Sequence, residues 1–323
     1  MTKGPVVHIA VRRLVMTRNI IYLVLWSLLQ VCVAHASARL ESGLLPAVVR
    51  IEIPNARGDP GVAGGFILKA SEDQNAKILL VTNKHVVGDW NYADGDIQTF
   101  HPSIDVFFYR SNDPSGQTYR ATRINLLNSA NRLDSTRVFL HPQPRVDLVL
   151  VDVTDKFHNP SEHVATNAFE PSFLLSFRHI QTQMTDIADE VIALGYPLGI
   201  RSLKNNYPIA KIGYVASTPG EEVSIPVKVP NRAGVSVDLT IEGKYLIVDG
   251  LIVPGNSGGP VVLMGGTRFR LDPVLHQVEG TTEPIKNLVA GMVSCGLGGG
   301  LTVVVSSDYI LELLPSATGV KPQ

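Results

Sequence analysis

Short apolar runs separated by polar turn residues characterise the chain from residue 44 onward. Residues 65–69 and 77–82 are two such runs joined by the polar segment 71–75, which is the pattern of a β-hairpin. Stretches with the period of a helix are scarce, whereas Gly and Pro, which occur 28 and 21 times in the chain, recur between the runs. The pattern therefore predicts an all-β fold.

The predicted strands fall into two groups, which suggests a division of the chain. We expect an N-terminal β unit over residues 44–160 and a C-terminal β unit over 185–315, with a tail at 316–323. A long polar insertion is expected at 265–287. The predicted strands are 48–53, 65–69, 77–82, 104–109, 120–126, 136–141, 146–151, 191–195, 211–216, 245–253, 261–264, 288–294 and 301–305, and a short closing helix is predicted at 308–314.

A serine lies in a glycine-lined turn between two apolar runs, in the segment Gly255-Asn256-Ser257-Gly258-Gly259-Pro260. A serine hydroxyl is a weak nucleophile unless a base lies within hydrogen-bond reach and donors face the oxyanion that forms. Because Gly255 has no Cβ, the backbone N–H groups of Gly255 and Ser257 can turn toward one point. A glycine-rich hairpin turn without chemistry is the alternative, but the full six-residue segment favours a nucleophile.

A base and a carboxylate are then expected at strand ends upstream, because a catalytic triad is defined by the roles and geometry of its members. His85 follows a predicted strand directly. Asp147 opens the apolar run 146–151, where an unpaired carboxylate would be costly to bury, so a histidine is the partner this position requires. Asp105 and Asp152 are the alternatives for the acid.

The first 36 residues contain four cationic side chains, no acidic ones, and an apolar run of 15 residues at 20–34. A helix that spans a membrane usually needs about 20 residues. The run ends in the small-x-small sequences Ala34-His35-Ala36 and Ala36-Ser37-Ala38. We therefore expect residues 1–36 to be a secretory signal peptide and the protein to be exported, periplasmic or secreted. The alternative is an uncleaved segment that anchors the protein to the membrane through residues 20–34.

Without this segment, 24 cationic residues remain against 29 acidic ones, a net charge of −5. This charge suggests no basic face, so nucleic acid is not expected as a partner. Cys295 is then the one cysteine left, so no internal disulfide is expected, and its thiol is interpreted as a small buried apolar group. His158 and His163 have neither a cysteine nor a spaced carboxylate beside them, so no metal site is expected.

Four blocks occur in this order along the chain: Thr82-Asn83-Lys84-His85, Asp147-Leu148-Val149-Leu150, Gly195-Tyr196-Pro197-Leu198-Gly199 and Gly255-Asn256-Ser257-Gly258-Gly259-Pro260. Together they resemble the trypsin-like serine proteases, in particular the bacterial high-temperature-requirement proteases, over about residues 45–315. The resemblance implies two six-stranded antiparallel β-barrels with the active site between them and a short C-terminal helix. It also implies polypeptide substrates and no cofactor.

By this resemblance, His85 is the general base, Asp147 is the carboxylate that orients it and Ser257 is the nucleophile. The N–H groups of Gly255 and Ser257 form the oxyanion hole. The side chain before the scissile bond would enter a pocket with Leu251 as its floor, one wall made by Ser294, Cys295 and Gly296, and Gly300 in the opposite wall. Proteases that cleave after Lys or Arg have an aspartate at the position of Leu251, so an apolar substrate residue is expected here.

The sequence departs from the resembled proteases at two points. The nine residues that follow Leu314 are too few for the PDZ domain that the high-temperature-requirement proteases carry. Asn256 stands where the animal digestive relatives have an aspartate that binds a newly freed N-terminus, so activation by proteolysis is not expected. The sequence predicts no oligomeric state.

Two other classes compete with a protease. A catalytically silent relative would keep the barrels as a binding module, but the presence of His, Asp and Ser in order argues against it. An esterase of the α/β-hydrolase class requires Gly-x-Ser-x-Gly and the order Ser, Asp, His. Here Gly-Gly-Pro follows the serine, and the order is His, Asp, Ser.

Overall fold

The computed structural model describes residues 42–54, 60–110, 118–162, 164–180, 185–231, 233–250, 252–265, 269–271, 278–280 and 287–319. The predicted signal peptide at 1–36, and with it the alternative membrane anchor at 20–34, lies outside these residues. None of the helices in the described ranges is long and apolar enough to cross a membrane.

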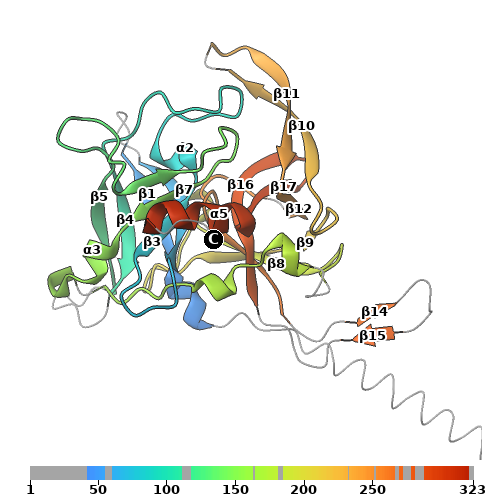
Figure 1. Cartoon of the computed structure of the whole chain (residues 1–323), viewed down its shortest axis with the longest axis horizontal. Coiled ribbons are helices and arrows are strands. Elements are labelled where there is room, and N and C mark those ends of the chain that lie inside the picture. Colours follow the sequence, from blue (N-terminus) through green and yellow to red (C-terminus); the bar gives the residue numbers. More distant parts are fainter. Residues whose placement is uncertain are drawn as a thin grey trace, which may run out of the picture. The chain divides into compact units, whose positions relative to one another are not determined.

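Among the described residues, the N-terminal half forms one antiparallel sheet of seven strands in the order β5-β4-β1-β2-β3-β7-β6 (Figure 1). Its strands are β1 (Val48–Ile53), β2 (Gly61–Lys69), β3 (Ile78–Thr82), β4 (Ser103–Tyr109), β5 (Tyr119–Asn125), β6 (Val138–Leu140) and β7 (Val149–Asp152). All residues of β3 are buried, so both faces of this inner strand are covered. Because Thr82 at the end of β3 pairs with Val149 at the start of β7, the segments that carry the predicted base and acid lie side by side.

The C-terminal half forms a closed barrel of six antiparallel strands in the order β12-β17-β16-β13-β8-β9. These strands are β8 (Glu190–Gly195), β9 (Ile209–Val215), β12 (Tyr245–Asp249), β13 (Pro260–Leu263), β16 (Leu288–Gly298) and β17 (Leu301–Ser306). Strand β13, which follows the predicted nucleophile, is fully buried, and its Val261 pairs with Ala193 of β8 and Gly291 of β16. The serine is therefore attached to an inner strand of the barrel.

These strands confirm the predicted all-β fold. The C-terminal half is the expected six-stranded barrel, whereas the described strands of the N-terminal half number seven and form an open order. The short helices between strands are η1 (Ser42–Ala47), α2 (Lys84–Val87), α3 (Thr154–Phe157), η2 (Pro160–Glu162), η3 (Pro171–Phe173), α4 (Phe177–Ile180) and η4 (Pro197–Gly199).

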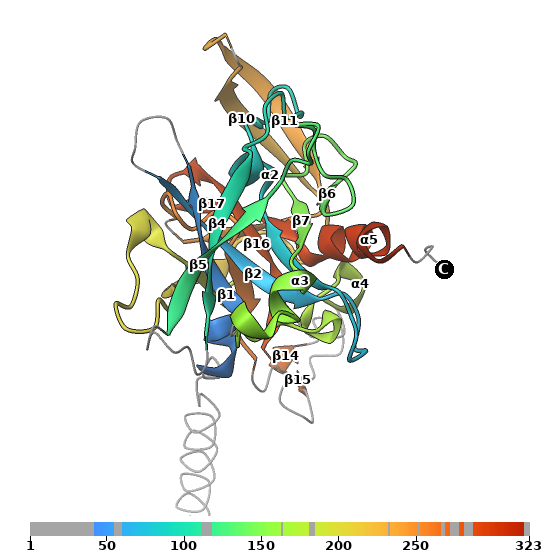
Figure 2. The ribbon, with the colours of Figure 1, turned by 90° about the vertical axis from the view of Figure 1, so that its left-hand side faces the viewer.

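Two inserted ribbons carry the remaining strands. β10 (Val223–Pro230) and β11 (Ser236–Gly243) pair over their full length, and the ribbon extends away from the barrel in two perpendicular views (Figures 1 and 2). Its first strand places apolar residues at every second position, so one face of the ribbon is apolar near the barrel. A separate two-stranded sheet, β14 (Phe269–Leu271) with β15 (Val278–Gly280), lies within the predicted insertion at 265–287.

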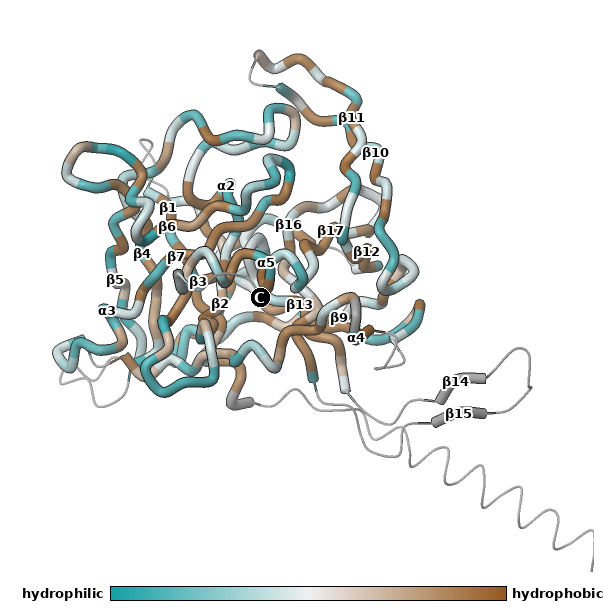
Figure 3. Tube along the Cα trace, in the orientation of Figure 1, coloured by the Kyte–Doolittle hydropathy of each residue, from teal (hydrophilic) through white to brown (hydrophobic). Residues whose placement is uncertain are grey.

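Helix α5 (Ser307–Thr318) closes the chain and packs between the two halves. The Ser306 side chain caps its first turn by accepting a hydrogen bond from Asp308 N, and Gly319 ends it with a positive φ of 74°. The helix continues past the predicted end at residue 314, so the first residues of the predicted tail 316–323 are helical. Tyr309 and Leu313 join a hydrophobic core that contains residues of both halves, and apolar strands in the interior are evident along the trace (Figure 3).

Candidate active site

His85 lies on α2, one helical turn that follows β3, and not at the strand end itself. The residues before it fix this turn. The Thr82 hydroxyl donates to the Gly64 carbonyl oxygen (2.9 Å), and the Asn83 side-chain amide donates to the Asp147 carbonyl oxygen (2.8 Å). These two bonds connect the helix to β2 and to the segment that carries the predicted acid.

Asp147 is fully buried just before β7 and has partners on both carboxylate oxygens. Its Oδ2 lies 2.7 Å from His85 Nδ1 and accepts the Ser294 hydroxyl at 2.9 Å, while its Oδ1 accepts the His85 backbone N–H at 3.2 Å. Asp147 therefore has the histidine partner that the sequence predicted for a buried carboxylate at this position. Of the alternative acids, Asp105 pairs with Arg123 and Asp152 pairs with Lys77.

The imidazole of His85 can accept and hold a proton in this setting. Burial of the ring lowers its pKa, but the charge and hydrogen bond of Asp147 outweigh this effect, and the net pKa of His85 is raised. Because Nδ1 is engaged by Asp147, Nε2 is the ring nitrogen left for chemistry. The side chain is 33% exposed, so a substrate can reach it.

Ser257 is held where the two halves meet. Its carbonyl oxygen accepts the Gly64 N–H of β2 (2.7 Å), and the next residue, Gly258, donates to the Val293 carbonyl oxygen of β16 (2.9 Å). The Ser257 hydroxyl donates to the Ser294 carbonyl oxygen at 3.5 Å, and the hydrogen bonds of the described residues do not include one between Ser257 and His85. Both side chains line the same cavity, and catalytic hydrogen bonds are often long or unformed without substrate.

The backbone before the serine is arranged to present N–H groups. Leu198 N–H donates to the Pro254 carbonyl oxygen (2.8 Å), and Tyr196 N–H donates to the Gly255 carbonyl oxygen (3.1 Å). In a planar trans peptide the carbonyl and the N–H point in opposite directions, so the Gly255 N–H is directed away from the Leu198 turn. Within the described part of the chain, the N–H groups of Gly255 and Ser257 have no acceptor.

Gly255 needs to be glycine at this position. Its φ of 98° is a region that favours glycine, and a Cβ would collide with the Tyr196 carbonyl. Tyr196 is itself fixed, since its single hydroxyl hydrogen is shared between the carbonyl oxygens of Val48 (3.0 Å) and Asn206 (3.1 Å). The turn that contacts the predicted oxyanion segment is thus tied to β1.

A cavity of about 440 Å³ contains both His85 and Ser257. Of the predicted pocket residues, Ser294, Cys295 and Gly296 line it. Gly300 is not among its lining residues and lies at the turn between β16 and β17, where its carbonyl accepts the Gly250 N–H (2.9 Å). Leu251, the predicted floor, lies outside the described residues.

Several residues at this cavity were not predicted from the sequence. They are Trp90, Asn91, Tyr92, Val229, Ile252, Val253 and Pro254. Trp90 and Tyr92 come from the loop after α2 and pack edge to face, with ring centroids 4.7 Å apart. Two aromatic residues so soon after the predicted base were the signal that could have indicated them. Val229 comes from the β10–β11 ribbon, and no local pattern marks it.

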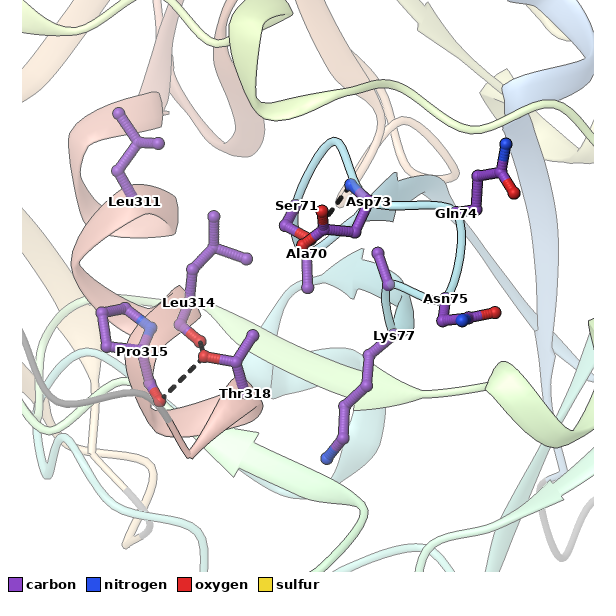
Figure 4. A pocket seen from close by; sticks show the side chains of 11 residues that line it. Ala70, Ser71, Asp73, Gln74, Asn75, Lys77, Leu311, Leu314, Pro315 and Thr318 are labelled. Carbon is purple, nitrogen blue, oxygen red and sulfur yellow. Dashed lines mark hydrogen bonds between the residues drawn. The ribbon is translucent and has the colours of Figure 1, made fainter.

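A larger cavity lies elsewhere, between the β2–β3 turn and the end of α5 (Figure 4). Its volume is about 790 Å³, and its lining includes Asp73, Lys77 and Leu314 but none of the predicted site residues. In the described ranges no group of three His, Cys, Asp or Glu side chains is arranged to hold a metal ion.

Residues 63–267, more than half of the chain, match the family described as "Trypsin-like peptidase domain". No curated protein matches the sequence.

Among solved structures, the active form of the Rv3671c protease from M. tuberculosis has 15% identity and a TM-score of 0.45, covering 87% of this chain and 84% of that one. The serine endoprotease from Yersinia pestis has 15% identity and a TM-score of 0.44, covering 85% and 64%. The thermostable serine protease AL20 from an extremophilic microorganism has 13% identity and a TM-score of 0.44, covering 86% and 100%.

The family match includes the segments that carry His85, Asp147 and Ser257, and it runs from β2 of the N-terminal sheet past β13 of the barrel. The chain therefore belongs to the trypsin-like peptidases and is a serine endopeptidase.

Proposed function

We propose that this protein is an exported endopeptidase that cleaves polypeptides through His85, Asp147 and Ser257 by way of an acyl-enzyme. One observation carries the proposal. The imidazole paired with buried Asp147 at 2.7 Å lines the same cavity as Ser257, and the N–H groups of Gly255 and Ser257 have no acceptor among the described residues. A base, a nucleophile and oxyanion donors are the minimum set for acyl transfer by serine.

In the first half of the reaction, Ser257 Oγ attacks the scissile carbonyl carbon and its proton passes to His85 Nε2. The negative charge that develops on the carbonyl oxygen is stabilised by the N–H groups of Gly255 and Ser257. The C–N bond then breaks, and the imidazolium gives its proton to the leaving amine. An ester between Ser257 and the substrate acyl group remains.

In the second half, water attacks the ester carbonyl while His85 Nε2 takes its proton. The tetrahedral species collapses, the proton returns to Ser257 Oγ and the carboxylic acid product leaves. Asp147 stays ionised and holds the imidazole in one orientation through both halves.

The cavity also supports a preference for an apolar residue before the scissile bond. Its lining includes Ile252, Val253 and Pro254 and contains no acidic residue within the described positions. A buried lysine or arginine side chain would lose hydration there without gaining a partner, at a cost of several kcal/mol. We expect medium apolar residues such as Val, Leu or Met to dominate when a peptide library is cleaved, and a dominant Lys, Arg, Asp or Glu would reject the preference.

Export is proposed from the sequence of residues 1–36, with cleavage after Ala36 or Ala38. N-terminal sequencing of the protein recovered outside the cytoplasm tests it. A mature protein that begins at Met1 would contradict the cleavage.

The triad is tested with Ser257→Ala and His85→Ala, measured by casein hydrolysis and by labelling with a fluorophosphonate. Each variant should lose at least about three orders of magnitude in kcat and keep the circular dichroism spectrum of the wild type, since both residues lie at the cavity. Ser257→Ala should also lose the label. Turnover at the wild-type rate in either pure variant would refute the assignment, and a wild type that neither cleaves nor labels would favour a silent binding module.

A further inference from the structure

The carboxylate of Asp147 is reached by a hydrogen-bonded chain that begins outside the predicted triad. Tyr92 OH lies 2.5 Å from Ser294 Oγ, which lies 2.9 Å from Asp147 Oδ2. All three residues are buried. This series of hydrogen bonds starts on the loop after α2, crosses to β16 of the barrel and returns to the N-terminal half at Asp147.

The direction of these bonds follows from the hydrogens available. An ionised carboxylate only accepts, so Ser294 must use its single hydroxyl hydrogen toward Asp147. Ser294 Oγ can then only accept from Tyr92, so the Tyr92 hydroxyl is the donor. The order Tyr92 to Ser294 to Asp147 is fixed, and each donor polarises the next bond.

We propose that Tyr92 is a positioning residue of this peptidase, which holds the Ser294 hydroxyl directed at Asp147 and thereby tunes the His85–Asp147 pair. This inference rests on the proposed function of that pair. Tyr92 makes no hydrogen bond to Asp147 or His85 among the bonds of the described residues and acts through Ser294.

Tyr92 is held rigidly enough for this role. Its ring packs on Trp90, and Trp90 Nε1 donates to the Pro144 carbonyl oxygen (3.1 Å), three residues before Asp147. The same loop thus contacts the Asp147 segment through Trp90 and reaches β16 through Tyr92. Burial raises the pKa of Tyr92 well above its ordinary value, which keeps the hydroxyl protonated as the donor.

Other ionisable groups also face this cluster and must stay unchanged in the test. Lys84 from α2, Tyr245 from β12 and Cys295 from β16 each interact with the Asp147 charge. Arg145 acts on Tyr245 from the loop before β7. Tyr92→Phe leaves these side chains in place but also removes the hydrogen bond between the Tyr92 hydroxyl and Cys295. The same substitution in a protein that lacks the Ser294 hydroxyl separates this contact from the path to Asp147.

The test is Tyr92→Phe, which removes the hydroxyl and keeps the ring on Trp90. Without its donor, Ser294 can rotate away, so Asp147 loses one hydrogen bond and the His85–Asp147 pair is held less firmly in the orientation for proton transfer. We expect kcat on a peptide substrate to fall about tenfold with KM unchanged. We also expect the acidic limb of the kcat/KM profile to move to higher pH, because a less solvated carboxylate raises the pKa of His85. If the Tyr92 hydroxyl had only a structural role, its removal would leave the acidic limb of the profile at the same pH.

Tyr309→Phe is the matched control, because Tyr309 is also buried and its hydroxyl accepts the Lys244 backbone N–H (3.0 Å) away from the site. It should keep the wild-type kcat and pH profile. In a Ser294→Ala background, Tyr92→Phe should have no further effect on kcat, since its path to Asp147 is already cut.

Three results would overturn the proposal: an unshifted acidic limb in Tyr92→Phe, effects that add in the double variant, or a melting temperature far below that of Tyr309→Phe with activity restored on cooling. Fluorophosphonate labelling of the wild type distinguishes each of these three results from failure of the proposed function. A wild type that labels while Tyr92→Phe behaves like it rejects the role of Tyr92 alone.

Discussion

Lys84 brings a positive charge into the protein next to the proposed general base. The residue is only 3% exposed, and its Nζ donates to the carbonyl oxygens of Gln143 (3.0 Å) and Pro144 (3.3 Å). These carbonyls belong to the loop that leads into Asp147. Burial lowers the pKa of Lys84 to about 8, against an opposing contribution from the Asp147 charge.

This lowered pKa has a consequence for stability. Between pH 8 and the ordinary value of 10.5, the unfolded chain holds a proton on Lys84 that the folded protein has lost. Stability from this group therefore rises with pH across that window and is lowest below it. This rise should be missing in Lys84→Met. The unfolding free energy of the wild type, measured relative to that of the variant, should therefore increase by about 1–3 kcal/mol between pH 7.5 and pH 10.

Urea unfolding of both proteins at several pH values measures this gain. Lys77→Met is the matched control, because Lys77 also donates to a backbone carbonyl, that of Ala317, but from a side chain that is 40% exposed. Lys84 is unchanged in this control, so its free energy of unfolding should show the same rise with pH as that of the wild type. A constant difference between wild type and Lys84→Met at all pH values would contradict the buried charge.

At the scale of elements, the turn η4 stands out because a leucine adopts a conformation that favours glycine. Leu198 has φ 53° and ψ 25°, and its side chain is 72% exposed. A left-handed leucine costs about 1–2 kcal/mol, which the surrounding hydrogen bonds must offset. The Leu198 N–H is the donor to the Pro254 carbonyl, so the strained residue also orients the proposed oxyanion donor Gly255.

Two substitutions of Leu198 should have different effects on kcat. Leu198→Gly keeps the N–H and removes the strain, so kcat should stay near wild type and stability should rise by up to about 1 kcal/mol. Leu198→Pro removes the N–H and fixes φ near −65°, so kcat should fall by about a hundredfold or more with little change in KM. Peptide hydrolysis and thermal unfolding of the two variants provide the measurements. Equal kcat in both would show that the turn does not orient the oxyanion donors.

The alternation of apolar and polar positions was enough to predict most strands, because a strand with one buried face has a period of two that the sequence records directly. Strand 48–53 was predicted with its observed bounds, and the paired runs at 65–69 and 77–82 became β2 and β3. Helix α2 was not predicted because its single turn is too short to show a helical period. The end of α5 was also predicted too early, because the helix continues through Pro315 to Thr318.

For the candidate site, local sequence motifs pointed to His85, Asp147 and Ser257. The fold places His85 and Ser257 at one cavity, and buried Asp147 lies 2.7 Å from the His85 ring. Tyr92 and Val229 could not be found in this way, because they reach the cavity from a loop and from an inserted ribbon whose positions depend on tertiary packing. Ser294 was predicted only as part of a pocket wall; it does line the cavity, and its hydroxyl also donates to Asp147, which the sequence did not predict. A sequence records which residues are present, but not which way a hydroxyl points.

For the whole molecule, the proposed site depends on the alignment of two halves that contribute different groups. His85 and Asp147 come from the N-terminal sheet, while Ser257 and the oxyanion donors come from the barrel. The halves are joined by a common hydrophobic core under α5 and by the hydrogen bonds Gly64 N–H to Ser257 O and Tyr196 OH to Val48 O. The contacts that align the halves are therefore made by the folded chain itself.

This arrangement leads to the prediction that no activating cleavage is needed. In the resembled digestive proteases, a freed N-terminus pairs with an aspartate and orders the oxyanion segment. Here that position is Asn256, which is uncharged and 1% exposed and whose side-chain amide donates to the Val253 carbonyl oxygen (3.2 Å). The order comes instead from the Tyr196 and Leu198 N–H groups, which bind the Gly255 and Pro254 carbonyls.

Protein purified with extra residues before Ser37, the first residue after the predicted cleavage at Ala36, should therefore show the same kcat and the same rate of fluorophosphonate labelling as protein that begins at Ser37. If the oxyanion segment instead needed an ion pair with a free N-terminus, the extension would prevent that pair. Labelling would then be slower by about tenfold or more, since a charged partner at a buried site contributes several kcal/mol. Mass spectrometry of the labelled protein confirms that the extension is still attached when the label is bound. Labelling that begins only after a defined cut would show that the oxyanion segment is ordered by a new terminus and not by the turn at 196–198.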